Sequence, residues 1–260
     1  MWDPAKYLSF GDYRSRPFFD LVARVNAESP RAIVDLGCGP GNLTITLARR
    51  WPNARLIGID SSAAMVDAAR DVQKRAVHGV DVREAEIQDW TCDAQTDVVI
   101  SNAALQWVPN HPELLVRWAR QLPSRAWIAV QVPGNFAAPS HTLVRELVSE
   151  PAWRGRLEAV RLREENTILA PDGYADLLAS ANCDVDAWET TYLQRLDGEN
   201  PVLEWITGTA LRPIRAALDD ADWDEFRATL APRLDAAYPR RADGTTYFPF
   251  RRVFFVARTP

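Results

Sequence analysis

The stretch IVDLGCGPGN, residues 33–42, is the most informative part of this sequence. A short apolar run leads into three glycines at alternate positions, Gly37, Gly39 and Gly41, and Asp35 stands two residues before the first of them. A glycine-rich turn directly after a buried strand lets the backbone approach a ligand closely. Two ligands fit such a turn, a dinucleotide and S-adenosylmethionine, and they imply different chemistry.

The glycine spacing and the acid separate these two ligands. The dinucleotide fingerprint is G-x-G-x-x-G, and Asn42 occupies the position of its third glycine. A carboxylate at Asp35 would face a pyrophosphate with like charge, whereas it would attract the amino group and sulfonium of S-adenosylmethionine. A turn without a ligand has no use for an acid and three glycines together. We therefore expect a cofactor site for S-adenosylmethionine that includes Asp35, Gly37, Cys38, Gly39, Gly41 and Asn42.

The composition is that of a globular protein rather than a nucleic-acid or membrane protein. The 260 residues suffice for one large domain, and 47% of them are hydrophobic and 25% charged. The formal net charge of −5 lacks the basic surplus that proteins use to bind phosphate backbones. No apolar run approaches the length of a membrane span, and the first residues lack the apolar region of a signal peptide.

The cysteines indicate the cellular compartment. Cys38, Cys92 and Cys183 are far apart, and they form neither an even set nor a pair with metal-ligand spacing. Such usage predicts a reducing environment without a disulfide framework, and it gives no indication of a metal site. We therefore expect a cytoplasmic protein.

Strand-like and helical patterns alternate between residues 31 and 132. Helical spacing of apolar residues appears in 42–51, 61–72 and 110–122, where Asn110 and Glu113 resemble a capping pair. This alternation predicts an α/β fold, a doubly wound, mostly parallel Rossmann-like sheet with helices on both faces. The strand-like runs are AIVDL (32–36), RLIGID (55–60), REAEI (83–87), DVVIS (97–101) and WIAVQV (127–132).

The rest of the chain extends this core. We expect helices at 16–27, with Pro17 in the first turn, and at 137–165, 171–182, 201–218 and 222–239, and strands at 184–196 and 247–257. The later helices suggest a cap over the carboxyl ends of the strands, where open α/β sheets bind ligands. An independent second domain is the alternative. The expected single domain comprises an amino-terminal lid (1–30), a cofactor core (31–135), cap insertions (136–170 and 198–242) and the remaining sheet (171–197 and 243–260).

The end of the second predicted strand offers further cofactor ligands. Asp60 follows the glycine loop by roughly 20 residues, where an acid accepts hydrogen bonds from ribose hydroxyls of either cofactor. Ser61 is a candidate for the cofactor site and equally for a helix N-cap. Met65, one turn into the helix, suits packing on the adenine or in the core.

Two more strand ends add polar and aromatic candidates. Asp89, followed by Trp90, is placed to accept from the adenine amino group at the end of the third strand. Asn102 ends the fourth strand, where a backbone carbonyl can meet the methionine amino group. Trp107 follows, and its ring suits either contact with the sulfonium or ordinary packing. The order and spacing of these signals carry the prediction.

These residues resemble the class I S-adenosylmethionine-dependent methyltransferases. The motifs that carry the resemblance are VDLGCGPGN, GIDSSAAM, IQDW and SNAALQWVPNH, within residues 31–111. Nearly the whole chain is similar to the trans-aconitate 2-methyltransferase family, through WDPAKYLSFGDYRSRPFFDLVARV, ALQWVPNH and EWITGTALRPIRAAL. That resemblance implies methyl transfer to one carboxylate of trans-aconitate, a small tricarboxylate, and cofactor roles for Asp35, Gly37, Gly39, Asp60, Asp89 and Asn102.

A tricarboxylate acceptor requires cationic ligands, and arginine pairs with carboxylates through two hydrogen bonds at once. The candidates are Arg14, Arg16 and Arg212, each of which suits a solvated surface equally well. His111 is a further candidate donor, and Tyr7 and Trp205 are candidates to close the site. Because a carboxylate is already ionised at neutral pH, we expect no general base.

Three alternatives remain. A related methyltransferase would act on another small carboxylic acid or on a hydroxyl, and a phenolic acceptor would favour a nearby general base. An NAD-linked oxidoreductase is disfavoured by Asn42 and Asp35. A non-catalytic module would bind S-adenosylmethionine without turnover.

Overall fold

The fold was obtained as a computed structural model that describes residues 11–74, 79–164 and 167–260. The chain divides into two compact units. The first unit consists of Met1–Pro133, Ile168–Thr190 and Arg252–Pro260, and the second of Gly134–Thr167 and Thr191–Arg251. The domain boundaries that we expected from the sequence stay a prediction.

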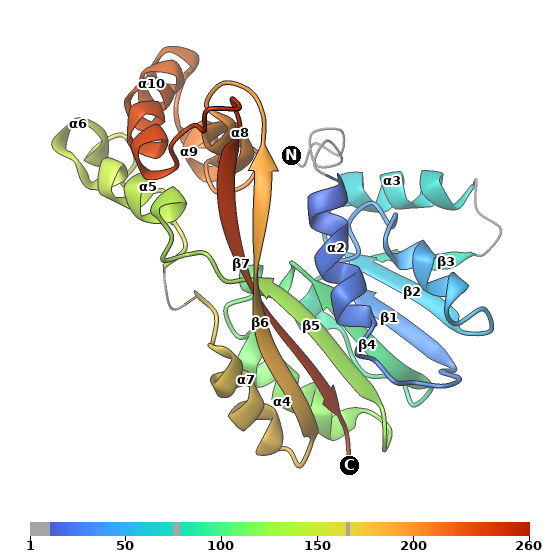
Figure 1. Cartoon of the computed structure of the whole chain (residues 1–260). Coiled ribbons are helices and arrows are strands. Elements are labelled where there is room, and N and C mark those ends of the chain that lie inside the picture. The colour runs from blue at the N-terminus through green and yellow to red at the C-terminus, as the bar shows by residue number, and fades with distance from the viewer. Residues whose placement is uncertain (1–10, 75–78, 165–166) are drawn as a thin grey trace. The chain divides into compact units, whose positions relative to one another are not determined.

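A seven-stranded sheet has the order β3-β2-β1-β4-β5-β7-β6 (Figure 1). Neighbours from β3 to β5 are parallel, and β7 runs antiparallel to β5. This arrangement confirms the predicted mostly parallel, doubly wound sheet. The strands are β1 (Ala32–Leu36), β2 (Arg55–Asp60), β3 (Val80–Glu84), β4 (Thr96–Asn102), β5 (Trp127–Pro133), β6 (Asp184–Leu196) and β7 (Thr246–Arg258).

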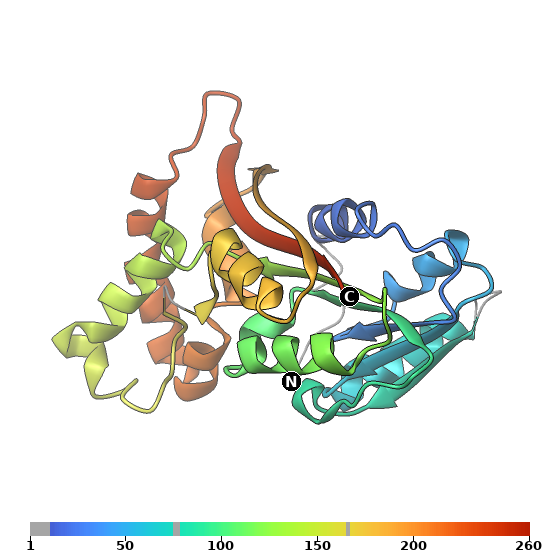
Figure 2. The ribbon, with the colours of Figure 1, turned by 90° about the horizontal axis from the view of Figure 1, so that it is seen from below.

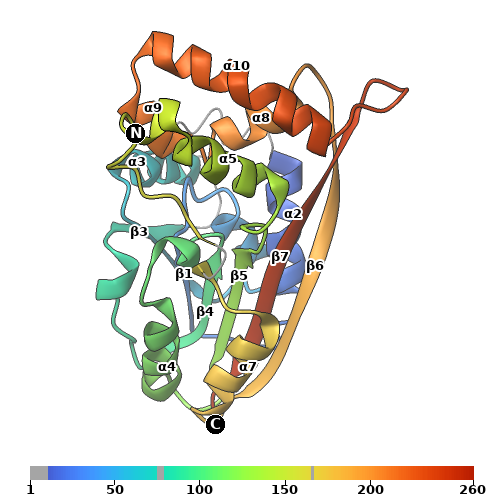
Figure 3. The same cartoon turned by 90° about the vertical axis from the view of Figure 1, so that its left-hand side faces the viewer.

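Helices cover both faces of the sheet in the first unit. α2 (Gly11–Val22) packs on one face of the sheet (Figure 2). The 3-10 helix η1 (Thr44–Arg49) is followed by Arg50, which donates a hydrogen bond to the Val22 carbonyl at the end of α2. α4 (His111–Gln121) and α7 (Pro171–Ala179) lie side by side on the other face (Figure 3). Leu114, Leu115 and Trp118 are fully buried there, as the helical spacing predicts. α3 (Ala63–Gln73) packs against β2 and β3.

The second unit is built mainly of helices around an aromatic core. α10 (Asp220–Ala237) packs on α5 (Pro139–Ser149) and α8 (Pro201–Thr207). Trp153 meets Phe226 edge-on, with ring centroids 5.1 Å apart. The short helices α6 (Pro151–Arg154) and α9 (Arg212–Ala217) complete the set. Among the described residues, no helix is both long and apolar enough to cross a membrane.

Several expected boundaries are wrong for physical reasons. The third strand is 80–84 rather than 83–87, because β3 is an edge strand with little buried pattern. Pro17 lies inside α2, which ends at Val22, rather than in a first turn. Asn110 occupies the N-cap position of α4, yet its side chain makes no capping hydrogen bond.

Three expected helices differ in kind or length. The stretch 137–165 forms α5 and α6, and residues 155–164 are not helical. Residues 42–51 contain a 3-10 helix, because the β-branched Thr44, Ile45 and Thr46 disfavour a regular α-helix. The stretch 201–218 forms two helices, α8 and α9, separated by the residues between Thr207 and Arg212.

Candidate functional site

The glycine loop of the first unit contains three residues in the left-handed region. Gly37, Gly39 and Gly41 have φ of 81°, 55° and 71°. A Cβ atom on Gly37 would lie 2.2 Å from the Cβ of Ala104, and one on Gly41 would lie 3.0 Å from the Cβ of Ala69. A Cβ atom on Gly39 meets nothing within 4 Å. Gly37 and Gly41 thus serve internal packing, whereas Gly39 presents bare backbone to open space.

Asp60 holds this loop against the next strand. One carboxylate oxygen accepts from the Gly39 N–H at 2.9 Å, and the other accepts from the Ser62 N–H at 2.9 Å. The amide groups of Gly37 and Cys38 both donate to the Ile59 carbonyl. The Asp60 carboxylate therefore holds the glycine loop next to the start of α3, and a nucleoside would bind between these two segments. The N-cap of α3 is Ser62 rather than Ser61, so the capping role expected for Ser61 is wrong by one residue.

Asp35 is a buried acid at the end of β1. Its side chain is 3% exposed, and its carboxylate accepts from the Thr44 hydroxyl at 2.6 Å. Burial raises the pKa of Asp35 from 3.8 to about 7; the Thr44 hydrogen bond opposes this, and the charge of Asp60 adds to it. A bound cation would favour the ionised form. The site is therefore suited to a positively charged ligand.

The end of β4 presents a strained and incompletely satisfied segment. The Asn102 Oδ1 atom is buried without a hydrogen-bond partner. Ala103 has φ of 57°, and its N–H donates to the Gln131 carbonyl at 2.8 Å. Parallel register pairs Asp35 with Ile100 and Asn102 with Gln131, so the side chains of Asp35 and Asn102 emerge on one face of the sheet. An unpartnered polar atom beside a strained residue is typical of ligand sites.

The remaining cofactor candidates are placed in different environments. Asp89 is exposed, and Asn42 is half-buried. Trp107 is 45% exposed, and its role at the sulfonium stays a prediction. Trp90 meets Trp118 edge-on, with centroids 5.5 Å apart, at the border of the core. Met65 is buried in α3.

Cys38 contributes its backbone rather than its thiol. The side chain is buried, and a Cβ atom on Gly58 would lie 2.9 Å from its sulfur. Burial raises the pKa of the thiol, so it stays protonated at neutral pH. The thiol is therefore not a nucleophile.

The acceptor candidates belong to different parts of the chain. Tyr7 lies outside the described residues. Arg14 belongs to α2, and the description covers its backbone alone. Arg16, further along α2, has a side chain that is 72% exposed and lies 3.8 Å from Asp20. Arg212, at the start of α9, is half-buried in the second unit.

His111 and Trp205 are buried, and both contact other residues of the protein. The Nδ1 atom of His111 lies 2.9 Å from the Val108 carbonyl, and Nε2 lies 2.8 Å from the Tyr174 hydroxyl. With both ring nitrogens engaged and the side chain buried, we withdraw His111 as a donor to substrate. Trp205 is buried against Phe248 and Phe250. It serves the core of the second unit, and its expected role in closing the site stays a prediction.

The sequence analysis missed a buried polar pair in the first unit. The Arg252 Nη1 atom donates to the Gln131 Oε1 atom at 2.9 Å, and both side chains are almost fully buried. The one signal in the sequence is a charged pair, Arg251 and Arg252, that interrupts an apolar strand. Burial of a polar side chain costs free energy unless that side chain has a hydrogen-bond partner, so each member of this pair supplies the partner of the other.

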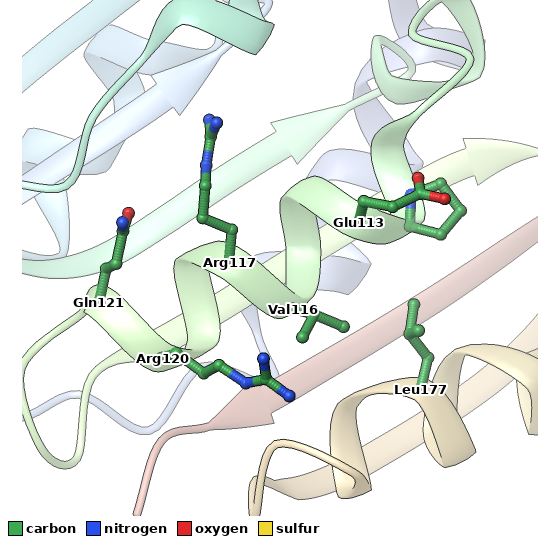
Figure 4. A pocket seen from close by; sticks show the side chains of 7 residues that line it. Glu113, Val116, Arg117, Arg120, Gln121 and Leu177 are labelled. Carbon is green, nitrogen blue, oxygen red and sulfur yellow. The ribbon is translucent and has the colours of Figure 1, made fainter.

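An open groove lies between α4 and α7 (Figure 4). It is lined by Pro112, Glu113, Val116, Arg117, Arg120, Gln121 and Leu177. Arg117 donates to the carbonyls of Gln88 and Trp90. It therefore holds the segment that follows β3, and none of the lining residues is a cofactor candidate.

The loop and strand ends fit S-adenosylmethionine on three counts. Gly39 leaves room for close approach, Asp35 and Asp60 supply negative charge, and Asn102 offers an unsatisfied acceptor. The described residues contain no group of three or more His, Cys, Asp or Glu side chains placed to hold a metal ion.

Comparisons with known proteins agree with this geometry. Residues 33–124 match a family described as a methyltransferase domain. Trans-aconitate 2-methyltransferase of Rhodococcus jostii is 62% identical over 258 residues, 99% of each chain, and that of Mycolicibacterium gilvum is 59% identical over the same share. The crystal structure of the YcgJ protein of Bacillus subtilis matches with a TM-score of 0.61 at 12% identity, covering 95% of this chain and 98% of that one. That structural likeness supports the fold alone.

Proposed function

The chain belongs to the trans-aconitate 2-methyltransferase family, and from that premise we propose that it transfers a methyl group to one carboxylate of trans-aconitate. The product is a monomethyl ester, and the methyl donor of the family is S-adenosyl-L-methionine. The observation that carries this proposal is identity of 62% across 99% of both chains. A similarity that spans both units includes the acceptor-binding residues as well as the cofactor loop.

We propose that the donor is held by the residues at the carboxyl ends of β1, β2 and β4. Asp60 is suited to accept from the ribose hydroxyls, since each carboxylate oxygen has a lone pair beyond the one that a loop N–H uses. Gly39 admits the cofactor next to bare backbone. Asp35 is suited to offset positive charge. Asp89 and Trp107 stay candidates for the adenine and the sulfonium.

The protein's task is alignment and exclusion of water rather than proton transfer. When bound, the cofactor supplies a methyl group on a positively charged sulfur, which makes that carbon electrophilic. An ionised carboxylate attacks it without losing a proton, so no side chain is required as a base. Holding the two reactants in line supplies on the order of 7–11 kcal/mol. Binding groups must also replace the water lost from the carboxylates, and arginines suit that purpose.

We also propose a cytoplasmic enzyme that acts without a nucleic-acid partner. Cys38, Cys92 and Cys183 are all free thiols, as a reducing compartment allows. The net charge of −5 opposes association with polyanions.

A methyl-transfer assay tests the proposed function. The protein is incubated with S-adenosylmethionine and a panel of di- and tricarboxylates, and products are identified by mass spectrometry. We expect one added methyl group on trans-aconitate and a higher kcat/KM for it than for any other acid. A panel in which another acid is preferred, or in which a hydroxyl is methylated, would contradict the assignment of the acceptor.

A further inference from the structure

A basic cluster lies inside the second unit, in the segment that follows β5. Its members surround Phe136, which is fully buried. Three basic side chains, His141, Arg145 and Arg163, converge on this ring or its carbonyl. Asn135 and Ser140 contact the same histidine. We call these six residues the Phe136 cluster.

Arg145 is fixed in the cluster by backbone carbonyls. From α5, its Nη1 atom donates to the Phe136 carbonyl at 2.9 Å and to the Arg163 carbonyl at 3.3 Å. These two hydrogen bonds connect Phe136 and Arg163, which lie at the two ends of the segment 136–163. They also hold a guanidinium, with its five donors, in one orientation. The guanidinium of Arg163 lies over the Phe136 ring, 5.6 Å from its centroid.

The cluster places positive charges close together in a partly desolvated environment. Burial lowers the pKa of Arg163 to about 10. Burial, together with the charges of Arg163 and Arg145, lowers the pKa of His141 to about 4. The histidine is therefore neutral at physiological pH, while both arginines remain charged. Two positive charges in this position favour the approach of a carboxylate.

Asn135 supplies a second, independent indication of a ligand. Its side chain is 4% exposed, and its Oδ1 atom is buried without a hydrogen-bond partner. Its Nδ2 atom is 3.5 Å from the His141 Nδ1 atom, at the limit of a hydrogen bond. The two ends of an amide are interchangeable in such an assignment. In the opposite orientation, the carbonyl accepts from the histidine and the NH2 group is the one that needs an acceptor.

We propose that Asn135, Arg145 and Arg163 bind the carboxylates of the acceptor, a role that the sequence analysis gave to Arg14, Arg16 and Arg212. This inference rests on the proposed function, and it identifies the groups that recognise a polycarboxylate. Two guanidiniums and an amide supply the planar donors that carboxylates require. His141 and Phe136 position these donors and are not themselves ligands. The guanidinium of Arg163 lies over the Phe136 ring, and its planar fork of donors suits bidentate pairing with a carboxylate.

The central experiment compares Arg163→Gln with a neighbouring control, Arg161→Gln. Arg161 is exposed and donates to the Glu158 carbonyl, so its loss leaves the cluster intact. The dissociation constant of trans-aconitate is measured by calorimetry with S-adenosylhomocysteine bound, and KM and kcat are measured in the assay above. Arg163→Gln should raise both Kd and KM about 10- to 100-fold, as for a lost charge-assisted hydrogen bond. Arg163→Lys should recover only part of the loss, because it lacks the fork.

Asn135→Asp separates a binding role from a structural one. The new carboxylate would lie beside His141, on which the charges of Arg145 and Arg163 act. The melting temperature should therefore hold or rise, while binding of a polycarboxylate should fall by about 10-fold or more. A second readout is the affinity for S-adenosylhomocysteine, which should match the unmodified protein in both variants. A residue that merely supports the fold would lower stability and both affinities together.

The outcomes distinguish this inference from the proposed function. If the unmodified protein methylates trans-aconitate and Arg163→Gln matches Arg161→Gln in Kd and KM, the inference is overturned and the proposed function stands. If another carboxylic acid is the preferred acceptor, the proposed function fails, and the same variants are measured with that acid. Loss of its binding in Arg163→Gln and Asn135→Asp would then support the cluster, and unchanged binding would overturn it. An acceptor without a carboxylate would overturn both.

Discussion

The glycine loop of the first unit and the Phe136 cluster of the second unit are opposite in charge and alike in design. The loop contains an acid, Asp35, whose pKa burial raises to about 7. The cluster contains Arg163, whose pKa burial lowers to about 10. In each case the fold buries a group in a way that disfavours its charged form. Each region therefore has a charge that a ligand of opposite sign would stabilise.

This difference matches the two reactants of the proposed reaction. A methyl donor with a sulfonium and an amino group is suited to the acidic region, and a polycarboxylate is suited to the basic one. Burial of a charged group costs stability. We infer that the buried charge of each region lowers the stability of the fold and raises the affinity for a ligand of opposite charge. In the first unit, both quantities can be measured in the same variants.

The largest expected effect is the loss of cofactor binding in Gly39→Val. The new side chain would occupy the open space beside the loop, in a residue whose φ of 55° also disfavours a branched side chain. Calorimetry should detect no binding of S-adenosylhomocysteine, while circular dichroism still reports a folded sheet. Undiminished affinity would remove Gly39 from the site.

Gly37→Ala is the matched control for that variant. Its Cβ atom would overlap that of Ala104, 2.2 Å away, inside the protein. It should therefore lower the melting temperature more than Gly39→Ala does. Equal losses of stability would contradict the division of the glycines into packing and ligand positions.

A smaller but more diagnostic effect is expected for Asp35→Asn. The folded protein holds the Asp35 proton more tightly than the unfolded chain, because the folded pKa is about 7 and the ordinary value 3.8. Stability from this group therefore falls as the pH rises from about 4 to 7, and the cost of ionisation is complete above that range. At about 1.36 kcal/mol per pKa unit, the asparagine variant should gain up to about 4 kcal/mol in the free energy of unfolding at pH 8.

The same variant should lose affinity for the charged donor. We expect the dissociation constant of S-adenosylmethionine to rise about 10- to 100-fold. S-adenosylhomocysteine lacks the sulfonium, so its affinity should fall less. Denaturant unfolding at pH 5 and pH 8, with calorimetry of both ligands, measures the two sides of this balance. An asparagine variant that is less stable at pH 8 and binds both ligands normally would break the proposed link between burial and affinity.

The acidic region can be predicted from the sequence because its residues lie close together along the chain or directly after a clearly patterned strand. Asp35 and Gly39 are four residues apart, and Asp60 follows a strand whose apolar pattern is clear. The buried strands β1, β2, β4 and β5 were placed within a residue or so for the same reason. The misplaced strand, β3, is mostly exposed, so its residues carry little apolar pattern.

The basic region was not readable, because tertiary packing alone assembles it. Asn135 and Arg163 are separated by two helices and have no characteristic spacing. Among the 30 Lys and Arg residues of the chain, nothing in the sequence distinguishes a guanidinium stacked on a buried ring from one in solvent. The same limit explains His111, which looks like an accessible donor in a loop motif and is instead buried against Tyr174.

The smallest effect on catalysis is expected for substitution of His111. This residue is a third buried titratable group, after Asp35 and Arg163, and it differs from them in having no proposed ligand. Burial lowers its pKa below the ordinary 6.5, so the ring is neutral at physiological pH. Unlike the Oδ1 atom of Asn135, both of its ring nitrogens have partners inside the protein, the Val108 carbonyl and the Tyr174 hydroxyl. His111→Asn should therefore cost stability, about 1–3 kcal/mol in the free energy of unfolding, because the Tyr174 hydroxyl loses its partner.

Turnover should survive that substitution. With both substrates saturating, kcat should stay nearly flat between about pH 6.5 and 8.5 in the unmodified protein and in His111→Asn, since an ionised carboxylate requires no base. The titration of Asp35 should instead appear in the KM of S-adenosylmethionine, which should rise as the pH falls below about 7. A loss of about 10⁴-fold in kcat for His111→Asn, with binding of both substrates intact, would show that proton transfer matters. That result would point to a protonated acceptor, and it would contradict the division of labour between a region that attracts the donor and a region that holds the carboxylates.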